Sequence, residues 1–212
     1  MPSIINASTS STGLLQSADA SGILQLQSNG TTGLTVNANA NVTISNSLFV
    51  SGNEVQPLVS GTSQTTTSGT SIDFTSIPSW VRRITVMFNG VSTNGTSIIQ
   101  IQVGSGSFVT SGYFANYGAI NLGTGQANIT TGIPVYAGAS AASVSTGHII
   151  LTLIGSNTWI ASGVVLYTNN AGAMYMIAGN TPSLAGALDR VRLTTVNGTD
   201  TFDAGSVNIL YE

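Results

Sequence analysis

Few residues of this chain could carry out acid–base, nucleophilic or metal chemistry. The sequence contains one histidine, His148, which opens an apolar segment, and it contains no cysteine. There is no second histidine to complete a metal site and no Gly-x-Ser-x-Gly motif to hold a catalytic serine. The closest pair of carboxylates is Asp200 and Asp203, and loop aspartates usually accept hydrogen bonds from nearby backbone amides. We therefore expect no enzyme activity, no cofactor and no metal site, with a calcium ion at Asp200 and Asp203 left open.

Aromatic side chains suggest a different chemistry, the stacking of sugar rings. The segment 112–118, Gly-Tyr-Phe-Ala-Asn-Tyr-Gly, has the composition of a loop, and further aromatic residues follow downstream. Tyrosine and tryptophan present an apolar face with a polar edge, whereas core packing is the alternative role for each ring. The residues that we select as candidates for binding a host-surface glycan are Tyr113, Tyr117 and Trp159.

Charged residues are scarce over the whole chain. Only 5% of the 212 residues are charged, against about 25% in an ordinary domain, although the mean hydropathy is +0.31. Net charge and interspersed ions normally keep proteins apart, so a surface of hydroxyls and amides is weakly protected against association. The composition therefore predicts surfaces that are covered by copies of the chain or by a larger assembly.

The charge balance also argues against two classes of partner. The net charge is −3 and the four arginines form two isolated pairs, whereas phosphate binding requires clustered cations, so we expect no nucleic acid. No segment approaches the roughly 18 consecutive apolar residues of a membrane-spanning helix, and the start of the chain lacks the basic residues of a secretory signal. We expect synthesis in the cytosol and no membrane insertion.

Residues 1–59 contain a loose repeat of short alternating segments. Segments 23–27, 34–37 and 42–44 recur about every 8 to 10 residues, with turn-forming residues between them. Such a small hairpin stack buries too little apolar surface to be stable alone, whereas three intertwined copies would form a β-prism. A threaded, disordered arm is the alternative. The residues predicted to form the trimer and attachment interface are Leu24, Leu26, Leu34, Val36, Val42 and Ile44.

The rest of the chain is predicted to be a linker followed by a β-domain. Residues 60–71 are rich in serine and threonine, which is typical of a linker or thin neck. Residues 72–212 show about eight to ten alternating segments separated by turn signals, the pattern of a β-sandwich or jelly roll. Segment 76–81 offers at most one helical turn. The predicted fold class is all-β.

Several segments resemble surface proteins of bacteriophage particles. Segment 15–27 resembles a short module at the start of many phage virion proteins, and Ile72–Val86 resembles the opening of a phage tail-protein β-domain. Arg190–Thr195 together with Asp203–Glu212 resembles the usual end of that domain. The resemblance implies a homotrimeric virion protein, of the tail-fibre, receptor-binding or capsid-decoration type, with a jelly-roll C-terminal domain. It implies no catalytic residues.

The sequence thus favours a non-enzymatic, homotrimeric structural protein on the phage particle surface. The first expectation is a tail fibre or receptor-binding protein that attaches to other virion proteins through its N-terminal arm and contacts a host glycan. The alternative is a capsid decoration protein that stabilises the phage head. A glycan depolymerase and a non-viral lectin-like domain are two further alternatives.

Overall fold

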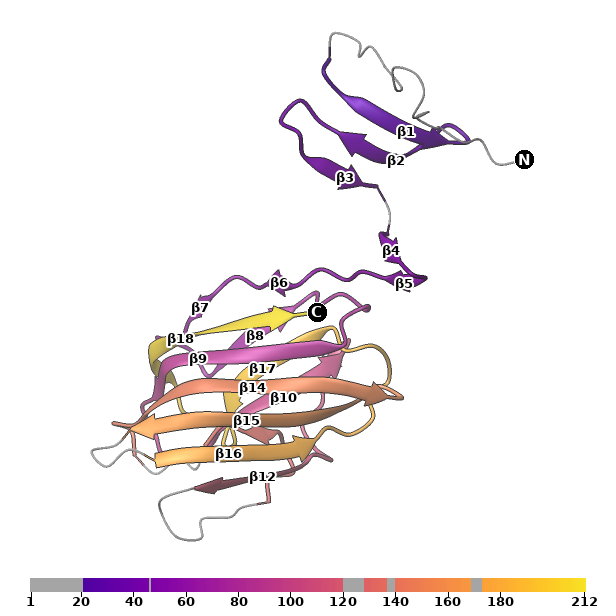
Figure 1. Ribbon diagram of the computed structural model, residues 1–212. Helices are drawn as coiled ribbons and strands as arrows, with labels where there is room; N and C mark the ends of the chain where they lie inside the picture. Colours follow the sequence, from indigo (N-terminus) through magenta and orange to yellow (C-terminus); the bar gives the residue numbers. More distant parts are fainter. Residues whose placement is uncertain (1–20, 46, 120–127, 137–139, 169–172) are drawn as a thin grey trace, which may run out of the picture. The chain divides into compact units, whose positions relative to one another are not determined.

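The computed structural model describes residues 21–45, 47–119, 128–136, 140–168 and 173–212. All regular secondary structure in these ranges is β-strand, which confirms the predicted all-β class, and none of the described residues forms a helix long and apolar enough to cross a membrane. The chain divides into two compact units, Met1–Gln56 and Pro57–Glu212 (Figure 1).

The N-terminal unit is built from two small antiparallel sheets. Strands β1 (Leu24–Ser28), β2 (Thr31–Val36) and β3 (Val42–Ile44) form a three-stranded meander, and β4 (Phe49–Val50) pairs with β5 (Asn53–Glu54). Asn29 and Gly30 connect β1 to β2 with φ values of 49° and 74°. Two successive positive φ values are those of a tight hairpin turn, for which Asn-Gly is the preferred sequence.

The C-terminal unit consists of two antiparallel sheets, a small one of five strands and a large one of eight. The small sheet has the order β11 (Ser107–Phe108), β10 (Ile99–Ser105), β17 (Arg190–Thr195) and β8 (Ser71–Thr75), with β13 (Ile133–Pro134) also paired to β10. The large sheet has the order β12 (Phe114–Ala119), β16 (Ala173–Asn180), β15 (Thr158–Thr168), β14 (Val144–Gly155), β9 (Arg83–Thr93), β18 (Phe202–Tyr211) and β6 (Val59–Ser60), with β7 (Gln64–Thr65) also on β18.

One apolar core joins the two sheets. Along β10, the side chains of Ile99, Ile101 and Val103 are fully buried, and they alternate with glutamines that point to the opposite side of the sheet. Inward residues of the large sheet, such as Ile149 and Leu151, belong to the same buried cluster. This arrangement is a β-sandwich, while the jelly-roll connectivity and the trimer stay predictions.

The segment 60–71 differs from its prediction as a linker. It runs along β18 and pairs with it at β6 and β7. Thr66 is fully buried, donating from its backbone to Gly205 and from its hydroxyl to Ala204 at 2.6 Å. The hydroxyl-rich composition misled the prediction because this segment is held by hydrogen bonds to a sheet edge rather than by apolar packing.

Candidate functional site

The six residues predicted to form a trimer interface share one face of the three-stranded N-terminal sheet. Residues opposite each other in a ladder point to the same side, as do residues two apart along a strand. The strand registers therefore create two rows, Leu24–Val36–Val42 and Leu26–Leu34–Ile44, which we call the N-terminal apolar face. Glutamine and threonine occupy the other face, where Gln27 Nε2 donates to Thr32 Oγ1 at 3.1 Å.

This apolar face has no cover within the described part of the chain. Leu24 and Leu26 are each 45% exposed and Val42 is 60% exposed. Between residues 21 and 58, every residue whose burial is described is exposed or half-buried. The described residues of this unit therefore expose many large apolar side chains and form no buried core among themselves, and a buried core is the main source of folding stability. Other exposed apolar residues in this stretch are Ile23, Leu48, Phe49, Val50, Val55 and Leu58.

The three aromatic residues predicted to bind a glycan lie in the core of the sandwich. Tyr113 is 2% exposed, Tyr117 7% and Trp159 2%. A ring that is packed on both sides cannot offer a face to a sugar, so the prediction of these residues as sugar-stacking contacts is corrected. The physical reason is strand alternation, which turns these side chains inward and leaves Phe114, at 69% exposure, as the outward ring of the segment.

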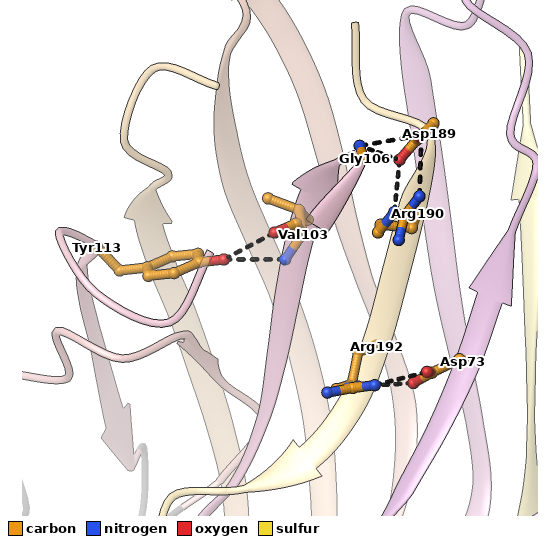
Figure 2. A network of polar contacts seen from close by, with 7 residues as sticks. All are labelled: Asp73, Val103, Gly106, Tyr113, Asp189, Arg190 and Arg192. Carbon is orange, nitrogen blue, oxygen red and sulfur yellow. Dashed lines mark hydrogen bonds and ion pairs between the residues drawn. The ribbon is translucent and has the colours of Figure 1, made fainter. Parts of the chain in front are cut away.

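Two of the buried rings have a structural role instead. The hydroxyl of Tyr113 accepts a hydrogen bond from Val103 N at 2.9 Å (Figure 2). It also donates to Val109 O at 2.9 Å. Burial raises the pKa of Tyr113 to about 12, since the charged phenolate would lose its hydration. Tyr117 packs edge-on against Tyr175, with ring centroids 5.8 Å apart.

Asp200 fixes two loops rather than presenting a free carboxylate pair with Asp203. It accepts hydrogen bonds from Asn197 Nδ2 at 2.6 Å and from Ser97 N at 2.9 Å, and these hydrogen bonds lower its pKa. Asp203 is exposed on β18. Among the described residues no group of three or more histidine, cysteine, aspartate or glutamate side chains could hold a metal ion.

The outward side of the small sheet carries two arginine–aspartate pairs (Figure 2). Arg192 donates from Nε and Nη2 to the two carboxylate oxygens of Asp73, both at 2.7 Å, across neighbouring positions of β17 and β8. Arg190 donates in the same way to Asp189 at 2.7 and 3.2 Å. The hydrogen bonds from Arg190 hold the pKa of Asp189 below its usual range. Each guanidinium charge is therefore balanced locally.

A polar cavity of about 330 Å³ lies beside these pairs, and we call it the small-sheet cavity. Phe108 borders the arginines, with the Arg192 Cζ atom 4.0 Å from the ring centroid and the Arg190 Cζ atom 5.6 Å from it. None of the sequence-predicted site residues lies there. The sequence pattern that could have pointed to this cavity is the alternation of polar with buried apolar residues along β10 and β17. The lining includes Ser71, Gln100, Gln102, Thr110, Thr131, Arg192 and Thr194.

On strands β12, β14, β15 and β16, the outward side of the large sheet exposes mainly apolar side chains. Strands β12, β14, β15 and β16 contain no aspartate, glutamate, lysine or arginine, and His148 lies between Val164 and Met87 in the ladder. We call this side of β12, β14, β15 and β16 the large-sheet outer face, and exposed apolar side chains gathered on one face are typical of a contact surface. Its exposed residues are Phe114, Ile154, Ile160, Val164, Leu166, Met174 and Met176.

The described residues thus offer an apolar N-terminal face, a largely apolar sandwich face and the polar small-sheet cavity. The arginines of the small sheet are bound to their own carboxylates, and His148 stands among apolar neighbours. The exposed apolar faces and the polar cavity are the kinds of surface that proteins use for binding. No protein-family model matches the chain, and no curated protein or solved structure is significantly similar to it.

Proposed function

We propose that this protein is a non-enzymatic, homotrimeric structural protein of the phage particle surface. Its N-terminal unit assembles with two further copies and attaches to other virion proteins, while the C-terminal sandwich contacts the host as part of a tail fibre or receptor-binding protein. The observation that carries the proposal is the N-terminal apolar face, which is exposed in a unit where no described residue is buried.

Three copies of the three-stranded sheet supply the missing core. Each copy contributes two rows of three apolar side chains, and three such faces turned toward one axis enclose a continuous apolar interior. The polar faces, with Gln25 and Gln27, then point to water. A face-to-face pair of sheets would also cover the rows, and the resemblance of the sequence to trimeric virion proteins favours three.

The charge distribution of the sandwich supports the same proposal. The large-sheet outer face exposes mainly apolar side chains, and its only ionisable residue on β12, β14, β15 and β16 is His148. A face with several exposed large apolar side chains is typical of a contact with another protein. It therefore suits a contact that adds to another interface in the same assembly, here the one formed by the N-terminal unit.

A capsid decoration protein is the second candidate, and one observation favours it. Tyr113, Tyr117 and Trp159 are buried, so the aromatic residues expected to touch a host glycan are engaged inside the fold. The remaining large surface is apolar and suits contacts between virion proteins. In that role the N-terminal unit would lie across neighbouring capsid subunits.

Two measurements test the proposal. Native mass spectrometry of the full chain should give a trimer, and a monomer at micromolar concentration would contradict the assembly proposal. Immunogold labelling of intact particles with an antibody against residues 57–212 then gives the location. Gold at the tail tip supports the adhesin, gold over the head supports decoration, and no gold on particles would refute a virion protein altogether.

A further inference from the structure

We propose that the small-sheet cavity binds a neutral oligosaccharide, that is, a sugar chain without carboxylate, sulfate or phosphate groups. The inference rests on the proposed role in host contact and names the ligand class for it. It also moves the binding site away from the aromatic residues that the sequence suggested and onto the outward face of the small sheet.

The cavity has the size and lining of a small-ligand site. Its volume of about 330 Å³ lies at the lower end of the range of about 300–1,000 Å³ found for such sites, which suits one or two sugar rings. Most of the lining residues carry a hydroxyl or an amide, and Arg192, Val196 and Gly198 complete the lining. Sugars present closely spaced hydroxyl groups that both donate and accept, and this lining offers partners of both kinds.

Part of the lining is fixed by the fold. Thr131 Oγ1 donates to Gln100 Oε1 at 2.8 Å, Gln102 Nε2 donates to Thr131 O at 2.9 Å, and Thr194 Oγ1 donates to Thr70 O at 2.9 Å. Gln100 and Gln102 are buried despite pointing away from the apolar core. Because these polar groups are already positioned, a ligand meets a preorganised wall and loses little side-chain freedom on binding.

Another part of the lining keeps hydrogen-bonding capacity for a ligand. Within the described ranges, the hydroxyls of Ser71 and Thr110, the Oε1 atom of Gln102 and the Nη1 atom of Arg192 form no hydrogen bond to protein atoms. In Figure 2, the Arg192 guanidinium meets Asp73 on one side and extends toward β10 on the other. Together these groups supply two hydroxyls, one acceptor and one donor.

The charge state of the cavity selects a neutral ligand. The positive charge of Arg192 is compensated by two hydrogen bonds to Asp73, and the guanidinium lies over Phe108. An acidic sugar would have to compete with Asp73 for this arginine. The bidentate pair instead holds the guanidinium plane in place, so that its free edge acts as a fixed donor to a hydroxyl oxygen.

The experiment uses the full-length protein and a defined set of probes. Neutral di- to tetrasaccharides of glucose, galactose, mannose and N-acetylglucosamine are compared with sialylated and uronic-acid oligosaccharides, first on an array and then by saturation-transfer NMR and calorimetry. We expect at least one neutral probe to bind and the acidic probes to bind more weakly. Binding of no neutral probe, or stronger binding of acidic ones, overturns the inference.

Matched variants locate the site. Ser71→Trp fills the cavity from its rim and should weaken binding at least about tenfold, whereas Thr75→Trp lies on the same strand and face outside the lining and should leave the affinity within about twofold. If Ser71→Trp does not fold, the variant Thr110→Val tests the site instead. It removes one exposed hydroxyl at constant shape and should weaken the affinity for the sugar about three- to tenfold. Unchanged affinity in the folded cavity variant places the sugar elsewhere and overturns the inference.

The outcome is separable from the proposed function. A trimeric particle protein that binds no neutral sugar contradicts this inference alone. A sugar-binding protein that is missing from the particle contradicts the proposed function alone.

Discussion

Placing a charge on the N-terminal apolar face should dissociate the assembly without unfolding the sandwich. Leu26 lies in one of the two rows of this face, opposite Leu34 in the ladder. In the variant Leu26→Asp a carboxylate replaces an apolar side chain at that point. The C-terminal unit, Pro57–Glu212, should keep its stability because it has its own core.

The expected loss of assembly free energy follows from the exposed fraction of the Leu26 side chain. Full burial of a leucine side chain contributes about 1.5–3 kcal/mol, and Leu26 is still 45% exposed in one chain, so covering the rest contributes about 1 kcal/mol. Three copies contribute about 3 kcal/mol, or about a hundredfold in the assembly equilibrium, even for Leu26→Ala. Desolvating an aspartate adds several kcal/mol per ion, so Leu26→Asp should be monomeric at micromolar concentration.

Sedimentation velocity measures the assembly, and thermal denaturation of the same samples measures the sandwich. The matched control is Gln25→Asp, which adds the same charge to the polar face of the same strand and should stay trimeric. A trimeric Leu26→Asp would show that the apolar face is not the interface. Equal dissociation of Gln25→Asp would show that net charge, and not the face that carries it, decides assembly.

Three further expectations concern the sandwich. Tyr113→Phe leaves a buried backbone N–H without its acceptor, so urea denaturation should show a loss of about 1–3 kcal/mol; no loss would contradict this role for the hydroxyl. The pKa of Asp200 is lowered in the fold by its hydrogen bond from Asn197, so its stabilisation is complete above about pH 4 and is lost as the pH falls through the lowered value. Melting temperatures between pH 2 and pH 6 should therefore depend less on pH in Asp200→Asn, and an unchanged profile would refute the assignment. Val164→Lys on the large-sheet outer face should weaken self-association without unfolding, whereas Thr75→Lys on the small sheet should not, as light scattering would show.

Local patterning was sufficient to predict the N-terminal sheet. The Asn29-Gly30 turn sets the pairing of β1 with β2, and the alternation of apolar and polar residues then places Leu24 and Leu26 on one face. These are short-range rules that a single sequence contains. These rules do not identify what covers the apolar face, because long-range contacts, within or between chains, are not encoded in local patterning.

The burial of the aromatic residues could not be read from local composition. Segment 112–118 has the glycines and polar residues of a loop, yet Phe114–Ala119 forms an edge strand paired with β16. That pairing joins residues about 60 positions apart in the chain and turns Tyr117 inward. Long-range pairing likewise places Ser71 and Thr194 side by side in the cavity, so the candidate site emerged only from the fold.

The two outward faces of the sandwich differ in what burial would cost them. The small-sheet face carries Arg190 and Arg192 with their carboxylates, and removing such ion pairs from water costs several kcal/mol per ion. Covering strands β12, β14, β15 and β16 of the large sheet costs less, because no arginine, lysine or carboxylate lies on them, whereas Arg83 and Asp203 lie on the neighbouring strands β9 and β18. Copies of the chain should therefore associate through the large sheet and leave the small sheet in water. If the chain assembles on a particle as proposed, the small-sheet cavity should stay open in the assembly, and several identical sites would raise a weak affinity for a sugar by multivalency.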